Sequence, residues 1–121
     1  MCTIKELTIG DKTIHVADVK LKYMMNIVNA AENCDYIDRV ILFGSSTRES
    51  CREDSDIDIA VFGNQPKTKA LTSKKYRRFL NQIYAFDDFS QSYDVLYFKT
   101  GDKHPYNIMN DINNGEVLYA R

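Results

Sequence analysis

Residues 39–62 read RVILFGSSTRESCREDSDIDIAVF and consist of two apolar segments joined by a polar loop. The first segment, residues 39–43, is β-branched and apolar and stops at Gly44, which predicts a buried strand ending in a Gly-Ser turn. The second segment, residues 57–62, is short, apolar and followed by Gly63, which predicts another buried strand. The sequence therefore predicts two core strands with a loop of mixed charge between them.

Asp56 and Asp58 occupy alternate positions where the second of these strands begins. Because side chains alternate between the two faces of a strand, both carboxylates are expected on the same face. Two carboxylates held side by side repel each other unless a cation lies between them, and hard oxygen ligands favour Mg²⁺. The pattern therefore predicts a divalent-metal site, against the alternative that both aspartates lie at a solvated strand end.

Gly44 and Ser45 predict a phosphate pocket at the end of the first strand. Glycine allows the backbone to approach a ligand closely, and Ser45 offers a hydroxyl and an N–H group. We expect Ser45 at the N-terminus of a helix, where anions are favoured. Arg48 is a candidate to neutralise phosphate, as is Arg52, although arginines in loops are commonly only solvated.

A third carboxylate is expected, because phosphoryl or nucleotidyl transfer with two metal ions uses bridging and flanking acids. Asp94 is the candidate, since it stands at the start of a β-prone run at residues 93–98. Asp87 and Asp88 are nearby alternatives at the end of a predicted helix. We therefore add Asp94 to the two aspartates of the metal site.

The spacing of these residues resembles the signature of the polymerase β-like nucleotidyltransferase superfamily, in particular its minimal nucleotidyltransferase branch. That signature is Gly-Ser, ten residues, then Asp-x-Asp. Gly44-Ser45, residues 46–55 and Asp56-Ile57-Asp58 match it without a gap.

The resemblance covers residues 40–98, and residues 111–119 are similar to the closing helix and strand of the family. It implies an α/β (α+β) fold, a mixed β-sheet with helices packed on it. A single nucleotidyltransferase domain is then expected over residues 1–121, with residues 1–17 as an N-terminal β-hairpin extension that matches nothing in the family.

The resemblance also implies Mg²⁺-dependent transfer of a nucleoside monophosphate, most favourably AMP from ATP, to a hydroxyl group of a protein or a small molecule. Asp56 and Asp58 would bind two metal ions, and Asp94 would complete the catalytic-metal site. The glycine and the serine of the motif would hold the β- and γ-phosphates. Pyrophosphate would leave as the acceptor hydroxyl attacks the α-phosphorus.

The partner expected from the resemblance is a protein. Members of the minimal branch resemble antitoxins that act with a HEPN-domain toxin, and this chain has no second domain to bind an acceptor. Many relatives carry a glycine after the arginine of the loop, whereas Arg48 is followed here by Glu49, which adds bulk and negative charge near the triphosphate. This departure supports a second hypothesis, a non-catalytic binding module of nucleotidyltransferase fold that sequesters its partner.

The N-terminal part is predicted to form a hairpin and a helix. The hairpin has strands at residues 3–9 and 13–16 around a three-residue turn at 10–12, and the helix covers residues 18–32 with Asp18 as its N-cap. Apolar residues at helical spacing define the buried stripe of this helix, namely Leu21, Met24, Met25, Val28 and Ala31.

Further elements are predicted from periodicity and turn residues: one helix at residues 67–86, a short helix at 105–113, and an edge strand at 117–119. The longer helix begins with a basic cluster free of acidic residues. It is either a solvated helix face or a docking surface for an acidic partner or RNA, and its members are Lys67, Lys69, Lys74, Lys75, Arg77 and Arg78.

Composition excludes several classes of protein. Sixteen lysines and arginines against seventeen acidic residues give a net charge of −1, so no overall positive field attracts nucleic acid or anionic lipid. Three cysteines without CxxC spacing and two histidines form no recognisable zinc site and fit a reducing compartment. The apolar runs are far shorter than the ~20 residues of a membrane helix. We expect a cytoplasmic protein without a membrane partner, and the sequence leaves a homo-oligomer open.

Overall fold

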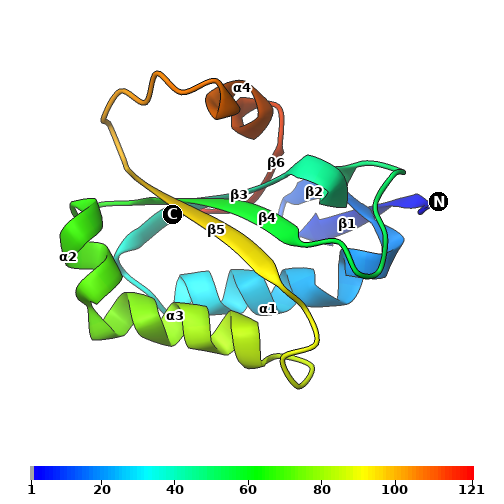
Figure 1. The fold of residues 1–121 in the computed structure, drawn as a ribbon, viewed down its shortest axis with the longest axis horizontal. Coiled ribbons are helices and arrows are strands. Elements are labelled where there is room, and N and C mark those ends of the chain that lie inside the picture. The colour runs from blue at the N-terminus through cyan, green and yellow to red at the C-terminus, as the bar shows by residue number, and fades with distance from the viewer. Residues whose placement is uncertain (1) are drawn as a thin grey trace.

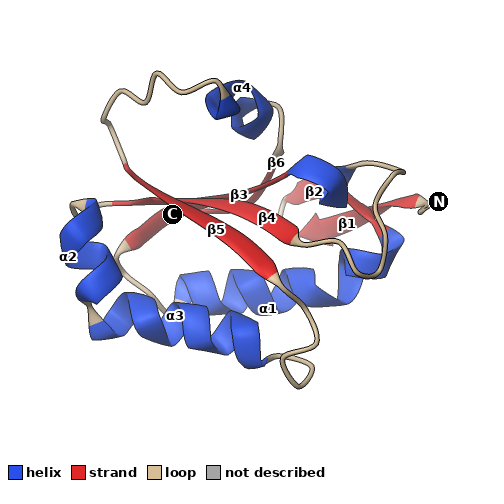
Figure 2. Cartoon of the chain, viewed as in Figure 1, coloured by secondary structure: helices blue, strands red, loops and turns tan. Residues whose placement is uncertain are grey.

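The computed structural model describes residues 2–121, and its main feature is a four-stranded mixed sheet with helices on both faces (Figures 1 and 2). The elements are β1 Ile4–Ile9, β2 Lys12–Ala17, α1 Leu21–Glu32, β3 Ile37–Phe43, β4 Ile57–Gly63, α2 Lys67–Thr72, α3 Lys74–Ala85, β5 Tyr93–Lys99, α4 Ile108–Asn113 and β6 Glu116–Ala120. The strand order across the sheet is β5, β4, β3, β6. Helices α1 and α3 pack side by side on one face, and α4 lies over the other (Figure 1). This architecture confirms the predicted α/β (α+β) class.

The two apolar segments of the opening motif are the central strands β3 and β4. They pair antiparallel, with Phe43 opposite Asp58. Strand β5 runs parallel to β4, and β6 runs antiparallel to β3, so the sheet is mixed as predicted. Nearly every residue of β3 and β4 is buried, which explains why both strands are apolar on two faces rather than on one.

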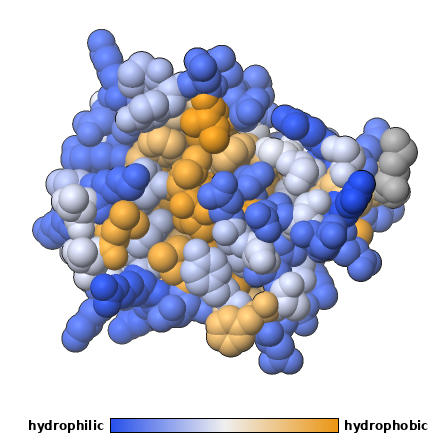
Figure 3. Space-filling view, in the orientation of Figure 1, coloured by the Kyte–Doolittle hydropathy of each residue, from blue (hydrophilic) through white to orange (hydrophobic). Residues whose placement is uncertain are grey.

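Side chains of β4 alternate between two cores. Ile57 and Ile59 belong to the larger core, which α1 and α3 cover. Ala60 and Phe62 belong to the smaller core on the side of α4. By the same alternation, Asp58 lies on the α4 side of the sheet. Because α4 has only six residues, it covers part of this face, and Figure 3 shows hydrophobic side chains at the surface between α4 and the helices below.

The N-terminal strands β1 and β2 form a separate antiparallel hairpin that packs on the main domain. Their loop contains two residues, Gly10 and Asp11, because Ile9 pairs directly with Lys12; the predicted three-residue turn is therefore wrong by one residue. Gly10 has φ +62°, a value that suits glycine in a tight hairpin loop. Ile14 of β2 is 2% exposed and packs in the larger core, so the hairpin contributes to that core.

The first long helix begins later than predicted. Residues Asp18–Lys20 form a 3-10 turn, α1 starts at Leu21, and no side chain caps either N-terminus, so the prediction of Asp18 as the N-cap is wrong. Met25, expected in the buried stripe, is 43% exposed, whereas Tyr23 and Ile27 are buried. The stripe is rotated because α1 packs against α3 as well as against the sheet.

The helix predicted over residues 67–86 is two helices, α2 and α3, separated at Ser73. The backbone of Ser73 is extended, with φ −80° and ψ 149°, and its Oγ accepts a hydrogen bond from the N–H of Tyr76 at 3.1 Å. Serine in this position caps a new helix, which explains the break. The last helix also starts late, at Ile108 rather than Pro105.

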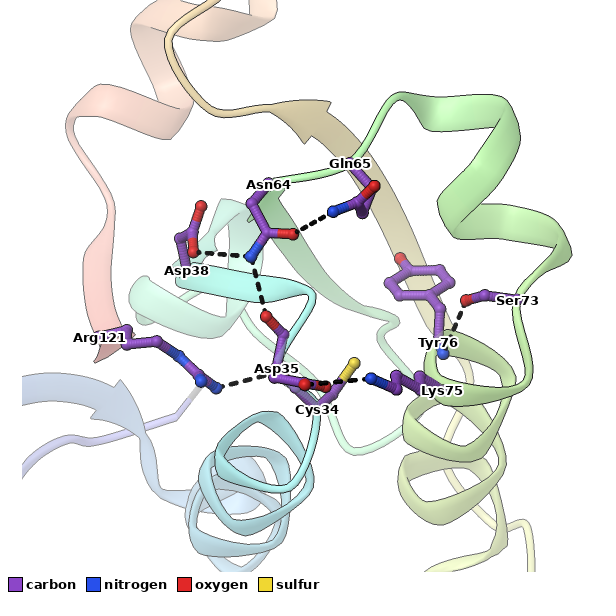
Figure 4. Close-up of polar contacts among 9 residues, drawn as sticks. All are labelled: Cys34, Asp35, Asp38, Asn64, Gln65, Ser73, Lys75, Tyr76 and Arg121. Atoms are coloured by element: carbon purple, nitrogen blue, oxygen red, sulfur yellow. Dashed lines mark hydrogen bonds and ion pairs between the residues drawn. The ribbon is translucent and has the colours of Figure 1, made fainter.

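A polar cluster joins the elements at one end of the sheet, where β3 begins and β4 ends (Figure 4). Nδ2 of Asn64 donates to the carbonyl of Asp35 at 2.8 Å, and Lys75 of α3 forms an ion pair with Asp35 at 3.1 Å. Arg121 donates to the carbonyl of Cys34 at 3.0 Å. The Gly-Ser turn and the aspartates lie at the opposite end. No helix among the described residues is both long and apolar enough to cross a membrane.

Candidate active site

The Gly-Ser turn follows directly from the end of β3. Gly44 has φ +74°, and residues Gly44–Thr47 form a single 3-10 turn rather than the expected start of an α-helix. Oγ1 of Thr47 donates to the carbonyl of Gly44 at 2.8 Å, which closes the turn. Ser45 is partly exposed beside this turn, whereas Ser46 is fully buried. The turn is therefore tight and fixed, and Ser45 is its accessible hydroxyl.

Asp58 and Asp94 are direct neighbours on adjacent parallel strands. They are register partners in the β4–β5 ladder, and the neighbouring residues Ala60 and Leu96 both lie in the smaller core. Because alternation along each strand places residues two apart on one face, both carboxylates lie on the α4 face. The structure thus brings together the two strands whose aspartates the sequence assigned to one site.

Burial and like charge raise the pKa of Asp58. Loss of solvent contributes most, and the negative charges of Asp94 and Asp56 contribute further. Asp56 is exposed and lies one residue before β4 begins, so it stands at the rim of the site rather than within the strand. Burial therefore disfavours the ionised form of Asp58 most, and repulsion from Asp94 and Asp56 adds to this effect.

The alternatives to Asp94 lie elsewhere. Asp87 forms an ion pair with Lys22 at 2.9 Å and accepts a hydrogen bond from Ser90 at 2.9 Å. Asp88 is exposed in the same loop, where residues 87, 88 and 89 all have positive φ. Neither residue is the register partner of Asp58, so Asp94 is the third carboxylate that the geometry supports.

The loop between the turn and β4 is largely exposed. Arg48, Glu49 and Arg52 are all exposed, and the carbonyl of Glu49 accepts a hydrogen bond from the N–H of Cys2 at 2.8 Å. The N-terminal segment therefore holds the backbone of this loop, while the charged side chains of the loop remain free to meet solvent or a ligand.

Lys20 is the residue near the site that the sequence did not single out. Its side chain is 0% exposed, and its ammonium group donates to the carbonyls of Glu53 and Ser55 and to Oε1 of Gln91, at 2.8, 2.6 and 2.7 Å. The only local signal is that Lys20 stands between the apolar residues Val19 and Leu21, which is too weak to predict a buried lysine.

The carboxylates fit a divalent cation, although they do not form a complete site. Within residues 2–121, no three histidine, cysteine, aspartate or glutamate side chains are gathered into a group that would bind a metal alone. Asp58 and Asp94 supply adjacent negative charge, and the missing β-carbon of Gly44 lets the carboxylate of Asp58 pack directly against the turn. Mg²⁺ commonly takes one or two carboxylates and completes its shell with phosphate oxygens and water. The arrangement therefore fits a metal ion that shares its ligands with a triphosphate.

A mixed sheet that brings a Gly-Ser turn and facing aspartates to one end defines a fold of the nucleotidyltransferase type. The family model described as Polymerase beta, Nucleotidyltransferase matches residues 25–121, which is most of the chain. The chain belongs to this family. No curated protein matches it in a sequence comparison. The match confirms the superfamily expected from the spacing of the motif, and it begins after the hairpin and Lys20.

Proposed function

We propose that this protein is a Mg²⁺-dependent nucleotidyltransferase that transfers AMP from ATP to a hydroxyl group of a protein or small-molecule acceptor. The observation that carries the proposal is the pairing of Asp58 with Asp94 across β4 and β5, with the turn at Gly44 packed against Asp58. Membership of the nucleotidyltransferase family supports the reaction class.

In this proposal, each residue of the site has a separate task. Asp56, Asp58 and Asp94 would hold two Mg²⁺ ions, which would stabilise the charge that develops on the transferred phosphate. The tight turn with Gly44 and Ser45 would hold the β- and γ-phosphates, and Arg48 would neutralise part of their charge. Asp94 would also orient the acceptor hydroxyl and take up its proton. A bond would form between the acceptor oxygen and the α-phosphorus as the bond to pyrophosphate breaks.

In this proposal, the acceptor is a partner protein that binds at the sheet face with the aspartates. The sheet face that carries the aspartates is covered only in part by α4, so an acceptor can approach it from outside. A HEPN-type toxin that receives AMP on a hydroxyl is the protein acceptor we propose, with this chain as its antitoxin.

Calorimetry with Mg²⁺ and ATP tests the first step. We expect the intact protein to bind ATP only with Mg²⁺, and we expect the Asp56→Asn, Asp58→Asn double variant to lose that binding. Asp88→Asn is the matched control, because Asp88 is exposed in a nearby loop and pairs with neither strand aspartate. Repeating the titration with GTP, CTP and UTP measures the choice of base.

Transfer is tested with ATP labelled at the α-phosphate. Label should move to an acceptor in the presence of the intact protein and not of the Asp58→Asn variant. Transfer that survives Asp58→Asn would reject the catalytic assignment. A folded protein that binds no nucleotide would overturn the proposal and favour the non-catalytic binding module.

A further inference from the structure

The buried lysine of the N-terminal segment connects three parts of the chain. Lys20 ends the 3-10 turn before α1, Glu53 and Ser55 lie in the loop that leads into β4, and Gln91 lies in the loop that leads into β5. The ammonium group donates one hydrogen bond to each of these three residues, so all three of its protons are used.

Gln91 completes the connection between the two strands. Its Nε2 donates to the carbonyls of Ser55 and Ser92, at 2.9 and 2.7 Å, while its Oε1 accepts from Lys20. The N–H of Ile57 then donates to the carbonyl of Ser92 at 3.0 Å, as the first link of the β4–β5 ladder. This network therefore fixes the starts of both strands, through Ser55, three residues before Asp58, and through Gln91 and Ser92, three and two residues before Asp94.

Burying the charge of Lys20 costs more free energy than burying an apolar side chain at the same place would. The side chain of Lys20 is fully buried, so its charge loses its contact with solvent. All three acceptors of its ammonium group are neutral oxygens, so no bonded carboxylate compensates for the free energy of that desolvation. Burial lowers the pKa of Lys20, and the negative charges of Asp54 and Asp56 act in the opposite direction. A charged donor makes stronger hydrogen bonds than a neutral one. A buried ammonium group is therefore suited to hold the loops before β4 and β5 in fixed positions.

We propose that Lys20 is a positioning residue that holds Asp58 opposite Asp94 by tying the start of β4 to the start of β5. This inference rests on the proposed function, because the pair of aspartates is its target. Lys20 lies before residues 25–121, the part that matches the family, whereas Glu53, Ser55 and Gln91 lie within it, so the network ties the N-terminal segment to the matched part of the chain.

The test compares Lys20→Met with a matched core variant, Val28→Ala. Methionine keeps an unbranched side chain only one heavy atom shorter than lysine and removes the three donated hydrogen bonds. Val28 is 2% exposed in the larger core and takes part in none of the hydrogen bonds of the network, so its truncation destabilises the fold without removing one of those bonds. At a temperature at which both variants are folded by circular dichroism, we expect Lys20→Met to weaken binding of Mg²⁺ and ATP about tenfold or more, and Val28→Ala to leave it unchanged.

A second variant keeps the inference testable if Lys20→Met does not fold. Gln91→Met removes only the bridging amide, and we expect a smaller loss of affinity. Where all the variants fold, the effects of Lys20→Met and Gln91→Met should be less than additive in the double variant, since both residues act through one network. Wild-type affinity in both single variants, or an equal loss in Val28→Ala, would overturn the proposal.

Amide chemical shifts separate this inference from the proposed function. If the intact protein binds no nucleotide, the proposed function fails, but NMR of the metal-free protein still tests the positioning. The amide signals of Asp56, Asp58 and Asp94 should move in Lys20→Met or Gln91→Met and stay in place in Val28→Ala. Unmoved signals would overturn the role of Lys20 whatever the binding result.

Discussion

A β-carbon on residue 44 would overlap the carboxylate of Asp58, with Oδ2 as the nearest atom. Gly44 also has φ +74°, a backbone conformation that other residues adopt only with strain. The turn that ends β3 and the carboxylate that begins β4 can therefore occupy this place together only when residue 44 is glycine. Gly44 therefore makes space for Asp58, the second aspartate of the motif.

Gly44→Ala is expected to abolish Mg²⁺-dependent ATP binding and to lower stability by roughly 1–3 kcal/mol. The methyl group would displace Asp58 from its position opposite Asp94. Gly10→Ala is the matched control, because Gly10 has φ +62° but open space around its Cα. Urea unfolding and calorimetry of both variants measure the two effects. Gly10→Ala should lose stability and keep binding; nucleotide binding retained in Gly44→Ala would show that the carboxylate can move without loss.

Asp58→Asn is expected to stabilise the metal-free protein at neutral pH. The pKa of Asp58 in the folded protein is raised by burial, Asp94 and Asp56 above its ordinary value of 3.8, so the ionised form is disfavoured in the folded state. Protonated Asp58 therefore contributes to the free energy of unfolding. This contribution is fully present below pH 3.8 and is lost as the pH rises through the pKa of Asp58 in the folded protein. The melting temperature of the variant should exceed that of the parent by a few degrees at pH 7, and the difference should shrink as the pH falls.

Mg²⁺ supplies the control for this pH dependence. A cation that relieves the repulsion should raise the melting temperature of the parent protein and have little effect on Asp58→Asn. A variant that is less stable than the parent at pH 7 in the absence of metal would mean that the ionised carboxylate is stabilised in the fold, contrary to its raised pKa.

The motif assigned Gly44 and Asp58 to one site, and the local connection between their strands explains why they meet. Two apolar strands joined by one loop pair antiparallel, which places the end of the first beside the start of the second. The position of Asp94 is a different case, because β5 follows β4 only after two intervening helices and pairs in parallel. Its β-prone run indicated a strand, and the resemblance supplied the expectation of a third carboxylate.

Two features could not be read from local patterns. Lys20 meets Gln91 across 71 positions of sequence and meets two backbone carbonyls, which no side-chain pattern marks. The break between α2 and α3 lies within a continuous helical periodicity, so periodicity concealed it. Leu71 stands in the apolar pattern of residues 67–86, yet it is 41% exposed on α2. Capping by Ser73 outweighed the pattern around it.

Ser73→Ala is expected to lower stability by about 0.5–2 kcal/mol, because it removes the acceptor for the N–H of Tyr76 at the start of α3. Ser73→Asp should restore most of the loss, since aspartate also caps helices well. Thr72→Ala is the control, as Thr72 is exposed and its hydroxyl bonds only within α2. Urea unfolding measures all three. ATP binding should not change, because Figure 4 shows Ser73 on the same side of the cluster as Gln65, which follows the end of β4, whereas Asp58 stands near the start of that strand. If Ser73→Ala is as stable as the parent, Ser73 does not act as a cap.

Phe89→Gly is expected to raise stability by roughly 0.5–1 kcal/mol. Phe89 has φ +59° and is 73% exposed, so the ring contributes little packing while its backbone adopts a left-handed conformation that costs about 1–2 kcal/mol for a residue of this kind. Glycine removes that strain, but it also increases the conformational entropy of the unfolded chain, which cancels part of the gain in stability. Tyr106→Gly is the matched control, because Tyr106 is a 62% exposed aromatic residue that is not among those with positive φ. Thermal unfolding should show a higher melting temperature for Phe89→Gly and no gain for Tyr106→Gly. Equal losses in both variants would mean that the ring of Phe89 stabilises the loop before β5 by more than its backbone strain.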